Sequence, residues 1–336
     1  MEVLNLTIYD IAREADVSIA TVSRVINNPE KVSPKKRAIV KAVLEKYNYT
    51  PNAMAQALVN NSSKTIGILV SDITNIHFTR SAYILENLFF KWGYTTLLCN
   101  TGDDLNKKIE YIRILSGKKV DGLIMLGSIF KNDKIKDIIL DYMPNIPVVT
   151  SNVSLFTDNF YSVEVDHSAG MDYAIKHLIE RGFNSIYFVQ GNETLNTLRK
   201  AQAFCVAYQN NKVAGNPKEN ILTCTHGALG GRQFAEKLFP KINNERKALI
   251  FIDDYTAIGA VSQFRKMGVD IPNKLGIIGH DNSTFSICSE PQLTTIDTQI
   301  EAISNIIGNT LNNIFNNIQV SKSVIVQPEL IIRETT

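Results

Sequence analysis

Hydrophobic residues along the chain follow two different patterns, and the change occurs at Thr65. Before about residue 50 they recur at intervals of three and four residues, which is the spacing of an amphipathic helix. The members of three such series are, in order, Ile8, Ile11, Ala12 and Ala15, then Val22, Val25 and Ile26, then Ile39, Val40, Val43 and Leu44. The pattern therefore predicts a small helical module at the start of the chain.

From Thr65 onward, apolar runs of strand length alternate with amphipathic helices. Such alternation is typical of a parallel sheet that is covered by helices on both faces. The first group of runs is TIGILVSD, TTLLCN, GLIML and PVVTS, and the second is SIYFVQ, a short run near 221, ALIFI and LGIIG. We therefore expect an α/β fold in which two doubly wound subdomains follow the helical module.

A very short turn joins the first two predicted helices. Thr7 and Ser18 are residues of the N-cap type that precede the first and second apolar series, and only Asp16 and Val17 lie between the end of the first series and the cap Ser18. Two short helices with so brief a connection match a helix-turn-helix, whose second helix reads DNA bases. An ordinary helical hairpin is the alternative interpretation.

The outer faces of the second predicted helix carry small, hydroxyl-bearing and basic side chains. Thr21 and Ser23 can donate hydrogen bonds to phosphates, and Arg24 can contact both O6 and N7 of a guanine. Small side chains let the helix lie deep in the major groove of double-stranded DNA. The candidate DNA-binding residues of this module are Thr7, Ser18, Ile19, Ala20, Thr21, Ser23, Arg24 and Asn27.

The segment TIYDIAREADVSIATVSRVINN, followed by YTPNAMAQAL, resembles the DNA-binding headpiece and hinge of the LacI/GalR family of bacterial transcription regulators. The resemblance implies a headpiece over residues 1–50 and a hinge helix with its linker over residues 51–64. It also implies that the two hinge helices of a homodimer pack in the minor groove, where Leu58 wedges between base pairs. Asn52 and Gln56 are placed to reach the backbone or base edges. Without the resemblance, Leu58 would be an ordinary packing residue.

The rest of the chain resembles the family's core, which is similar to periplasmic binding proteins. This resemblance implies that the last section of the chain is shared between two subdomains. We expect the N-subdomain to comprise residues 65–161 with about 294–320. The C-subdomain is expected to comprise residues 162–293 with about 321–336.

Charge is distributed unevenly, although the net charge is only +2. Residues 1–64 contain nine Lys and Arg against six Asp and Glu, whereas the remainder contains twenty-six against twenty-seven. The excess of basic charge therefore lies on the amino-terminal module, as a phosphate-binding surface requires.

The sequence disfavours several classes of protein. No apolar run approaches the roughly 18 residues of a membrane span, and the first residues lack the apolar core of a signal peptide. We therefore expect a cytoplasmic protein that does not bind a membrane. The four cysteines form no C-x-x-C pair, the histidines lack metal-ligand spacing, and no G-x-G-x-x-G follows a strand. We expect no metal, no cofactor and no enzymatic activity.

Polar residues directly after the apolar runs are candidate ligand contacts, because open α/β sheets bind ligands beyond the carboxyl ends of their strands. These residues are Ser71, Asp72, Ser151, Asn152, Gln190, Asp253, Asp254, His280 and Asp281. Each could equally be a helix cap or a turn residue, since these residue types are favoured there in any case.

The family resemblance gives four positions a more specific role. Asp281 lies in GHDN, which is similar to the family's GYDN or GFDN, whose Asp accepts hydrogen bonds from the effector. Asp253 is the polar residue of FIDDYTAIG that is implied to face the cleft, whereas Asp254 is implied to be structural. Phe78 matches an aromatic residue that covers the ligand, and His226 lies near the position of an aromatic platform.

Two residues depart from the family's pattern. Lys200 replaces a frequent effector-binding Arg and cannot form the same bidentate fork. Ser151 stands where sugar-binding members commonly have Asp. We expect the effector to be a neutral carbohydrate or a sugar phosphate. The candidate effector-binding residues are Ser71, Phe78, Ser151, Lys200, His226, Asp253 and Asp281.

The main functional hypothesis is a homodimeric repressor whose effector changes its affinity for a pseudo-palindromic operator. TIYDIAREA also resembles the branch of catabolite control proteins, which use a phosphorylated carrier protein as corepressor. The matching positions on a late helix are Glu301, Asn309 and Asn313, which offer no cation to a phosphate. That partner therefore ranks below a small molecule. A sugar-binding protein without regulatory function would leave the amino-terminal module unexplained.

Overall fold

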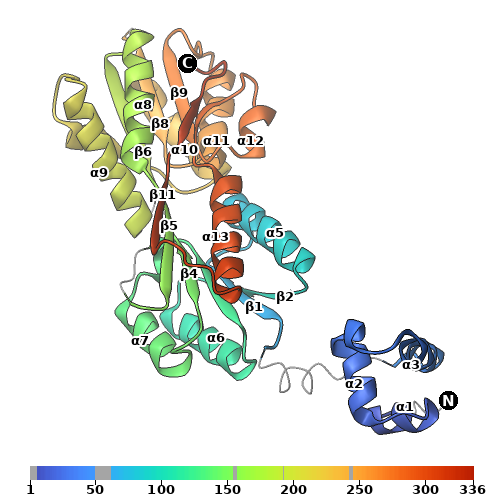
Figure 1. The fold of residues 1–336 in the computed structure, drawn as a ribbon. Coiled ribbons are helices and arrows are strands. Elements are labelled where there is room, and N and C mark those ends of the chain that lie inside the picture. The colour runs from blue at the N-terminus through green and yellow to red at the C-terminus, as the bar shows by residue number, and fades with distance from the viewer. Residues whose placement is uncertain (1–5, 50–61, 154–156, 192, 242–244) are drawn as a thin grey trace. The chain divides into compact units, whose positions relative to one another are not determined.

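The computed structural model describes residues 6–49, 62–153, 157–191, 193–241 and 245–336. The chain divides into two compact units, residues 1–64 and residues 65–336 (Figure 1). Among the described residues, no helix has both the length and the apolar character that a membrane span requires.

The first unit is a helical module whose turns follow the predicted caps. The helix α1 (Ile8–Glu14) follows Thr7, and α2 (Ile19–Asn27) follows Ser18, whose Oγ accepts a hydrogen bond of 3.3 Å from the backbone N–H of Thr21. Asp16, in the connection, has a φ of 49° and so adopts the left-handed conformation that lets the chain reverse in few residues. A short 3-10 turn, η1 (Pro29–Lys31), leads to α3 (Pro34–Lys46).

The core of this unit is small and apolar. Ile11 of α1, Val22 of α2 and Val40 of α3 are fully buried and belong to one cluster. The ends of α1 and α3 are joined by Glu14, which accepts hydrogen bonds from Lys46 Nζ at 2.6 Å and from the hydroxyl of Tyr47 at 2.9 Å. The helix-turn-helix geometry therefore has its own core and does not depend on the second unit for packing.

The first lobe of the larger unit is built on a parallel sheet with the strand order β11-β5-β4-β3-β1-β2. In chain order its strands are β1 (Thr65–Val70), β2 (Thr95–Asn100), β3 (Gly122–Leu126), β4 (Val148–Ser151), β5 (Phe160–Val165) and β11 (Ser323–Val326). The helices α5 (Ile76–Lys91) and α13 (Ile300–Phe315) pack on one face. On the other face lie α6 (Leu105–Gly117) and α7 (Asp133–Tyr142), with the 3-10 turn η2 (Ser128–Phe130) after β3.

The second lobe repeats this plan with the strand order β12-β10-β9-β8-β6-β7. Its strands are β6 (Ser185–Gln190), β7 (Ile221–Thr223), β8 (Lys247–Phe251), β9 (Leu275–His280), β10 (Thr294–Asp297) and β12 (Glu329–Ile331), and only the β10–β12 pair is antiparallel. One face packs against α8 (His167–Glu180) and α9 (Leu195–Asn210), and the other against α10 (Ala228–Leu238) and α11 (Asp254–Lys266). The remaining short elements are η3 (Pro217–Asn220), η4 (Phe239–Lys241) and α12 (Thr284–Cys288).

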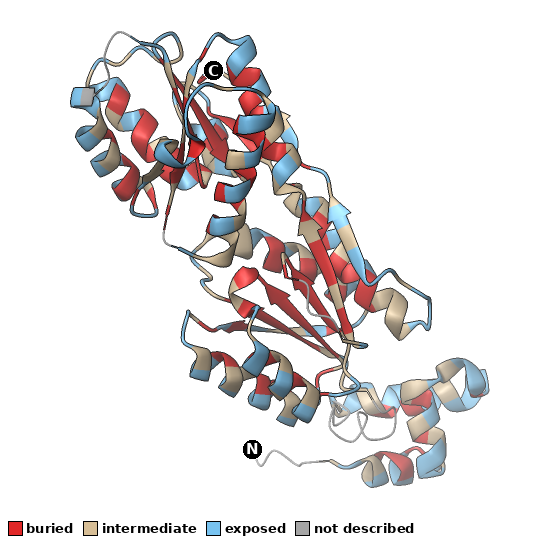
Figure 2. Cartoon of the chain, turned by 90° about the vertical axis from the view of Figure 1, so that its left-hand side faces the viewer, coloured by how far each residue is buried: buried red, intermediate tan, exposed pale blue. Residues whose placement is uncertain are grey.

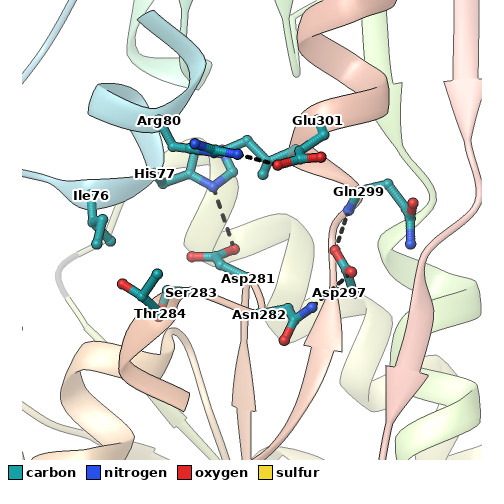
Figure 3. Close-up of a pocket in the computed structure, with 11 residues that line it drawn as sticks. Ile76, His77, Arg80, Asp281, Asn282, Ser283, Thr284, Asp297, Gln299 and Glu301 are labelled. Carbon is teal, nitrogen blue, oxygen red and sulfur yellow. Dashed lines mark hydrogen bonds and ion pairs between the residues drawn. The ribbon is translucent and has the colours of Figure 1, made fainter. Parts of the chain in front are cut away.

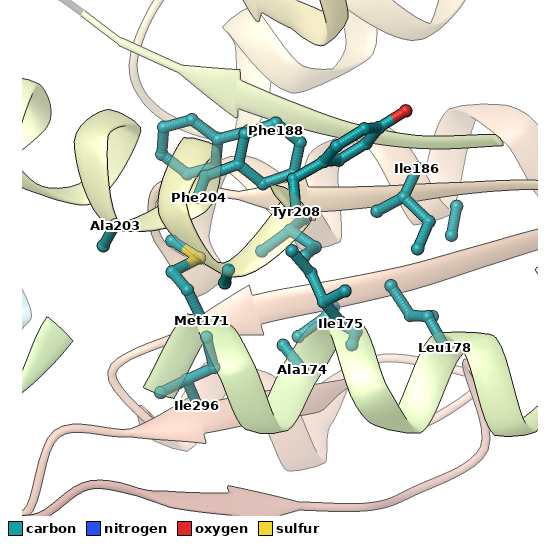
Figure 4. Close-up of a cluster of buried hydrophobic side chains, with 14 of the residues drawn as sticks. Met171, Ala174, Ile175, Leu178, Ile186, Phe188, Ala203, Phe204, Tyr208 and Ile296 are labelled. Carbon is teal, nitrogen blue, oxygen red and sulfur yellow. The ribbon is translucent and has the colours of Figure 1, made fainter. Parts of the chain in front are cut away.

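Both sheets are buried on both faces, which explains why their strands read as continuous apolar runs. In β1, for example, Ile66 and Ile68 face α5 and α13, whereas Leu69 packs with α6 and α7. The central strands of both lobes are accordingly buried along their length (Figure 2). In the second lobe, Phe188 and Phe204 stack with ring centroids 5.7 Å apart within the cluster of Figure 4.

Three predicted subdomain boundaries were wrong, the first by part of a strand and the other two by one strand each. Residues 160–165 were divided at 162, but the whole of β5 pairs with β4 and β11, so the first crossover lies at Asp166. Strand β10, expected in the N-subdomain, pairs with β9 in the second lobe. Strand β11, expected in the C-subdomain, pairs with β5 in the first. Apolar runs predict that strands exist, but which strands pair depends on the tertiary contacts made on either side of a crossover.

Candidate functional site

The exposed face of α2 is the first candidate site. Val22 and Val25 are buried, so they fix which side of the helix points outward. Ile19, Ala20 and Arg24 are exposed on the other side, as the spacing predicted. This face therefore carries two apolar side chains and one long, positively charged side chain.

The remaining headpiece candidates make local contacts. Thr21 and Ser18 share a hydrogen bond of 2.9 Å between their hydroxyl oxygens, and Asn27 Nδ2 donates to Ser23 Oγ at 3.4 Å. Thr7 donates through its hydroxyl to Asp10 Oδ2 at 2.6 Å, so its hydroxyl proton is used within α1. Thr7 therefore acts as a cap in this structure. The hinge candidates Asn52, Gln56 and Leu58 lie outside the described residues.

A cavity of about 480 Å³ between the lobes of the larger unit is the second candidate site (Figure 3). Three segments line it: the first turns of α5, the loop from β9 into α12, and the crossing from β10 into α13. The lining residues are Ile76, His77, Arg80, Asp281, Asn282, Ser283, Thr284, Asp297, Gln299, Ile300 and Glu301. Because α5 belongs to the first lobe, the β9–α12 loop to the second and the third segment connects them, a change in the angle between the lobes must change this cavity.

Asp281 is the predicted effector residue that the structure places in the cavity wall. Its Oδ1 lies 3.1 Å from Nδ1 of His280, 3.8 Å from Nδ1 of His77 and 4.0 Å from Nζ of Lys200. Burial alone would raise the pKa of Asp281, but the nearby positive charge of Lys200 holds it well below its usual range. Asp281 therefore presents a carboxylate to the cavity.

Lys200 lies behind Asp281 and does not line the cavity. Its side chain is 3% exposed, and its Nζ donates to the carbonyl oxygen of Ile252 at 3.0 Å and to Nδ1 of His280 at 3.1 Å. Burial lowers the pKa of Lys200, and the charge of Asp281 opposes this effect. Lys200 thus balances the charge of the site from below its surface. Its neighbour Arg199 donates to the carbonyl oxygen of Asn152 at 2.9 Å and pairs with Glu164 at 3.0 Å.

His226 and Asp253 form a separate pair in the second lobe. His226 Nε2 lies 3.1 Å from Asp253 Oδ2, and Asp253 also caps α11 by accepting a hydrogen bond of 2.7 Å from the backbone N–H of Thr256. The hydrogen bond to Asp253 raises the pKa of His226, and the charges of Asp72 and Asp281 raise it further. Carboxylates of both lobes therefore act on the pKa of His226, although neither His226 nor Asp253 is part of the cavity wall.

The three candidates of the first lobe differ in accessibility. Ser151 is buried, and its Oγ accepts a hydrogen bond of 3.1 Å from the backbone N–H of Gly127, so its role in this structure is to hold that loop. Ser71 is half-buried after β1. Phe78 packs over Gly127, where an added Cβ would lie 3.0 Å from the ring, and meets the ring of His77 edge to face.

Asp254 is structural, as expected. It is 1% exposed, and it accepts hydrogen bonds from Thr295 Oγ1 at 2.6 Å and from the backbone N–H and the Oγ of Ser283 at 2.6 and 2.9 Å. Burial raises the pKa of Asp254 to about 7. The loop that carries Asp281 is therefore anchored from below by a second, hidden carboxyl group.

Sequence reasoning missed several residues of the cavity wall. His77 directly precedes the candidate Phe78, and Arg80, one turn further along α5, pairs with Glu301 of α13. Asp297 is the last residue of β10 and Gln299 lies two residues beyond it, so the same rule that selected residues at strand ends could have found them. In the described part of the chain, no group of His, Cys, Asp and Glu has the geometry of a metal site.

Known proteins resemble both units of the chain. The family model of the LacI bacterial regulatory proteins matches residues 7–52, and the model of the periplasmic binding protein-like domain matches residues 175–336. An HTH-type transcriptional regulator of Lachnoclostridium phytofermentans is 31% identical, and the match covers 98% of this chain and 99% of the relative. Catabolite control protein A of Priestia megaterium is also 31% identical, with 98% of both chains covered.

Solved structures share the fold. A lac repressor dimer bound to its operator and the anti-inducer ONPF has a TM-score of 0.87 at 22% identity, with 98% of both chains covered. A periplasmic binding protein/LacI transcriptional regulator from Alkaliphilus metalliredigens, complexed with D-xylulofuranose, has a TM-score of 0.66 at 28% identity and covers 81% of this chain and 99% of its own.

Proposed function

Because the chain belongs to the LacI family of bacterial regulatory proteins, we propose that it is a homodimeric repressor of carbohydrate-use genes. Members of this family are DNA-binding transcription regulators with an effector-binding domain, and the family is not enzymatic. In our proposal, a sugar bound between the lobes changes the affinity of this cytoplasmic protein for a pseudo-palindromic operator. No metal or cofactor takes part.

The exposed face of α2 is the observation that carries the DNA-binding proposal. Arg24 reads a guanine in the major groove through O6 and N7, and Ile19 and Ala20 lie against thymine methyl groups. Ser18, Thr21, Ser23 and Asn27 contact phosphates and base edges, and Thr7 fixes the start of α1. Because these side chains surround a helix whose orientation is set by buried valines, the headpiece is preorganised for the groove.

The hinge part of the proposal rests on the family resemblance of residues 51–58. Leu58 wedges between the central base pairs in the minor groove, where unstacking a step allows the duplex to bend. Asn52 and Gln56 contact the backbone or base edges on either side of the wedge. Short helices are marginal alone because nucleation is costly, so contact with DNA supplies the packing that orders this segment.

The effector we propose is a neutral sugar, with a sugar phosphate as the less favoured variant. The cavity offers both donors and acceptors, since Asp281 and Asp297 accept hydrogen bonds and Asn282 and Gln299 can do both. Its acidic side chains outnumber its cations, and Arg80 is already paired with Glu301. Sugar hydroxyl groups suit such a surface, whereas a phosphate dianion would be repelled by it.

Each candidate effector residue has a part in this proposal. Asp281 binds a sugar hydroxyl directly, and Lys200 keeps it ionised. Phe78 covers one face of the sugar, and Ser71 and Ser151 shape the first-lobe wall. His226 and Asp253 contact the ligand from the second lobe when the lobes close. Binding must favour one lobe angle over another, because a ligand with equal affinity for both states shifts nothing.

Two exposed apolar patches support the proposed homodimer. On the first lobe, Tyr83 and Phe90 of α5 are 60% and 74% exposed, and Leu98 on the edge strand β2 is 45% exposed. On the second lobe, Tyr255 of α11 and Ile287 of α12 are 42% and 54% exposed. Large apolar side chains that are exposed close together mark an interaction site on a protein surface. The open edge of β2 also favours an interface there, because an unpaired strand edge can pair with another chain.

A catabolite-control-type regulator is the second candidate, favoured by the relative from Priestia megaterium. Such a regulator would need to capture a phosphorylated carrier protein. The outward residues of α13 include Glu301, Asn305 and Asn309, which carry no positive charge for a phosphate. The geometry therefore supports a small-molecule effector more strongly than this partner.

The test is selection of DNA fragments by the full-length protein at moderate salt, followed by binding measurements on the selected sequence with and without sugars. A thermal-shift screen with D-ribose, D-xylulose, cellobiose and glucose 6-phosphate identifies the effector class. We expect a palindromic site and a sugar that both raises the melting temperature and changes DNA affinity. A protein that prefers no sequence, with or without these compounds, would refute the proposal.

A further inference from the structure

The two residues after β9 adopt a conformation that is uncommon for residues with side chains, although Asp and Asn tolerate it best. Asp281 has a φ of 98° and Asn282 a φ of 49°, so two consecutive residues with side chains lie in the left-handed region. Such conformations cost free energy and persist only where surrounding contacts hold them. The contacts that hold this pair also set the position of Asp281, which presents its carboxylate to the cavity.

Arg333 makes the shortest hydrogen bond to Asn282, although it does not line the cavity. Its Nη2 donates to Oδ1 of Asn282 at 2.7 Å. Its Nη1 donates to the carbonyl oxygen of Leu293 at 2.8 Å and to Oγ of Ser286 at 3.0 Å, and its backbone N–H donates to Oγ1 of Thr294 at 2.9 Å. The guanidinium is therefore fixed on several sides and presents one N–H to Asn282.

Asn282 passes this constraint on to the cavity wall. Its Nδ2 donates to Oδ2 of Asp297 at 2.9 Å, and the other oxygen of Asp297 accepts the backbone N–H of Gln299 at 2.7 Å. Gln299 itself has a φ of 58° and begins the crossing into α13. One chain of hydrogen bonds thus runs from Arg333 through Asn282 and Asp297 to the crossover between the lobes (Figure 3 shows the last two links).

We propose that Arg333 is a positioning residue of the effector site, which holds Asn282 and thereby directs the carboxylates of Asp281 and Asp297 into the cavity. This inference rests on the proposed role of the cavity as the effector site. Arginine suits the task because its planar fork presents several donors at fixed angles, whereas the lysine ammonium is a point charge on a flexible stem. The same contacts couple the orientation of Asp281 to the crossover on which lobe closure depends.

Three variants test the chain of contacts. Arg333→Lys keeps the charge but loses the fork. Asn282→Gly removes the amide that accepts from Arg333, and glycine adopts the left-handed conformation without strain, so this variant breaks the side-chain contact without straining the backbone. The double variant shows whether the two residues act together. Arg265→Lys is the matched control, because Arg265 also donates to a backbone carbonyl, that of Glu290, and lies outside this chain of contacts.

The first measurement needs no effector: the pH titration of His77 in the full-length protein, followed by the NMR signal of its ring. Burial lowers the pKa of His77, and the nearby charge of Asp281 opposes this, while Lys200 adds to it. If Arg333 fixes Asp281, both single variants lower the pKa of His77 further, and the double variant equals Asn282→Gly. The second measurement is the affinity for whichever of D-ribose, D-xylulose or cellobiose stabilises the wild type. We expect a loss of roughly tenfold to hundredfold in both single variants.

The outcomes separate this inference from the proposed function. A changed His77 titration in a protein that binds none of these sugars would refute the proposed effector class while supporting the role of Arg333. Arg333 is not a positioning residue if the titration and the sugar affinity of folded Asn282→Gly match those of Arg265→Lys. It is equally refuted if Arg333→Lys weakens binding by a further tenfold in the Asn282→Gly background. Should Arg333→Lys fail to fold, Asn282→Gly still decides the question.

Discussion

The ammonium of Lys200 donates a hydrogen bond of 3.1 Å to Nδ1 of His280. Because an ammonium has no lone pair, Nδ1 must be unprotonated and act as the acceptor. His280 is therefore a neutral ring with its proton on Nε2, and burial together with the charge of Lys200 lowers its pKa to about 4. Lys200 is thus the buried counter-ion of Asp281, which lies 4.0 Å from it.

Lys200→Met should raise the pKa of His280, because the change removes a nearby positive charge while leaving the ring buried. The variant should also lose on the order of 3 kcal/mol in free energy of unfolding, since Asp281 is left without its buried partner. NMR titration of His280 and denaturation with urea measure the two effects. Lys237→Met, on the exposed surface of α10, is the control. An unchanged His280 titration would show that Lys200 does not set the charge state of this cluster.

Asp254→Asn should change how stability depends on pH. The pKa of Asp254 is raised from 3.8 to about 7, so the folded protein binds a proton more tightly than the unfolded chain. The associated stability is fully present below about pH 4 and is lost as the pH rises through about 7. The difference between the two values corresponds to roughly 4 kcal/mol as an upper limit.

We therefore expect the wild type to lose stability relative to Asp254→Asn between about pH 5 and about pH 8, as measured by urea denaturation at each pH. Asp270→Asn, at an exposed turn before β9, is the comparison. Parallel stability curves for wild type and Asp254→Asn would mean that the pKa of folded Asp254 does not lie in this range.

The sequence was most informative where local patterns determine the structure. Ser18 and the valines of α2 specify a helix and its exposed face from a few neighbouring residues, so both were predicted correctly. The rule of strand ends selected Asp281, which lines the cavity, for the same reason. The sequence did not reveal that Lys200 is buried behind Asp281 and does not line the cavity, because that depends on His280 and Ile252, which are distant in the chain.

Two further failures have a common physical cause. Arg333 and Asp297 were not singled out, since their roles exist only when β10 and the last residues of the chain pack beside the β9 loop. Ser151 was selected for its position after a strand, yet its hydroxyl is used by the backbone of Gly127. A strand end predicts that a polar group is near the cleft, but its hydrogen-bond partner decides whether it can bind a ligand.

Arg24→Ala should weaken binding to the selected operator by roughly 1–3 kcal/mol and leave nonspecific binding nearly unchanged. The reason is that Arg24 is proposed to read a base, whereas nonspecific affinity comes from phosphate contacts. Titration of labelled operator and of a scrambled duplex at one salt concentration measures both. Arg13→Ala, exposed on α1, serves as the control. Equal losses on both duplexes would assign Arg24 to phosphate contact.

Leu58→Ala should reduce both operator affinity and DNA bending, because a methyl group cannot fill the gap between unstacked base pairs. Circular-permutation gel shifts report the bend, and titration reports the affinity. Ala57→Ser, next to it in the chain, is a suitable control. If the bend angle of the Leu58→Ala complex equals that of the wild type, the wedge lies elsewhere.

Phe90→Lys should dissociate the proposed dimer. Phe90 is 74% exposed on α5, and burial of a phenylalanine contributes about 1.5–3 kcal/mol. In a twofold-symmetric dimer each protomer carries the substitution. The dimer should therefore lose roughly 3–6 kcal/mol of association free energy, and repulsion between the two lysines should weaken it further. Sedimentation velocity measures the mass, and Leu198→Lys is the matched control, because Leu198 is 52% exposed on α9, on the opposite side of this unit from α5 (Figure 1).

The same variant connects assembly with DNA recognition. In a dimer, binding of one headpiece holds the second headpiece close to its half-site and so raises its effective concentration there. Separate monomers bind each half-site independently. Phe90→Lys should therefore weaken binding to the full operator far more than binding to a single half-site. If Phe90→Lys remains dimeric while Leu198→Lys becomes monomeric, the dimer forms through α9, and the α5 patch must have another partner.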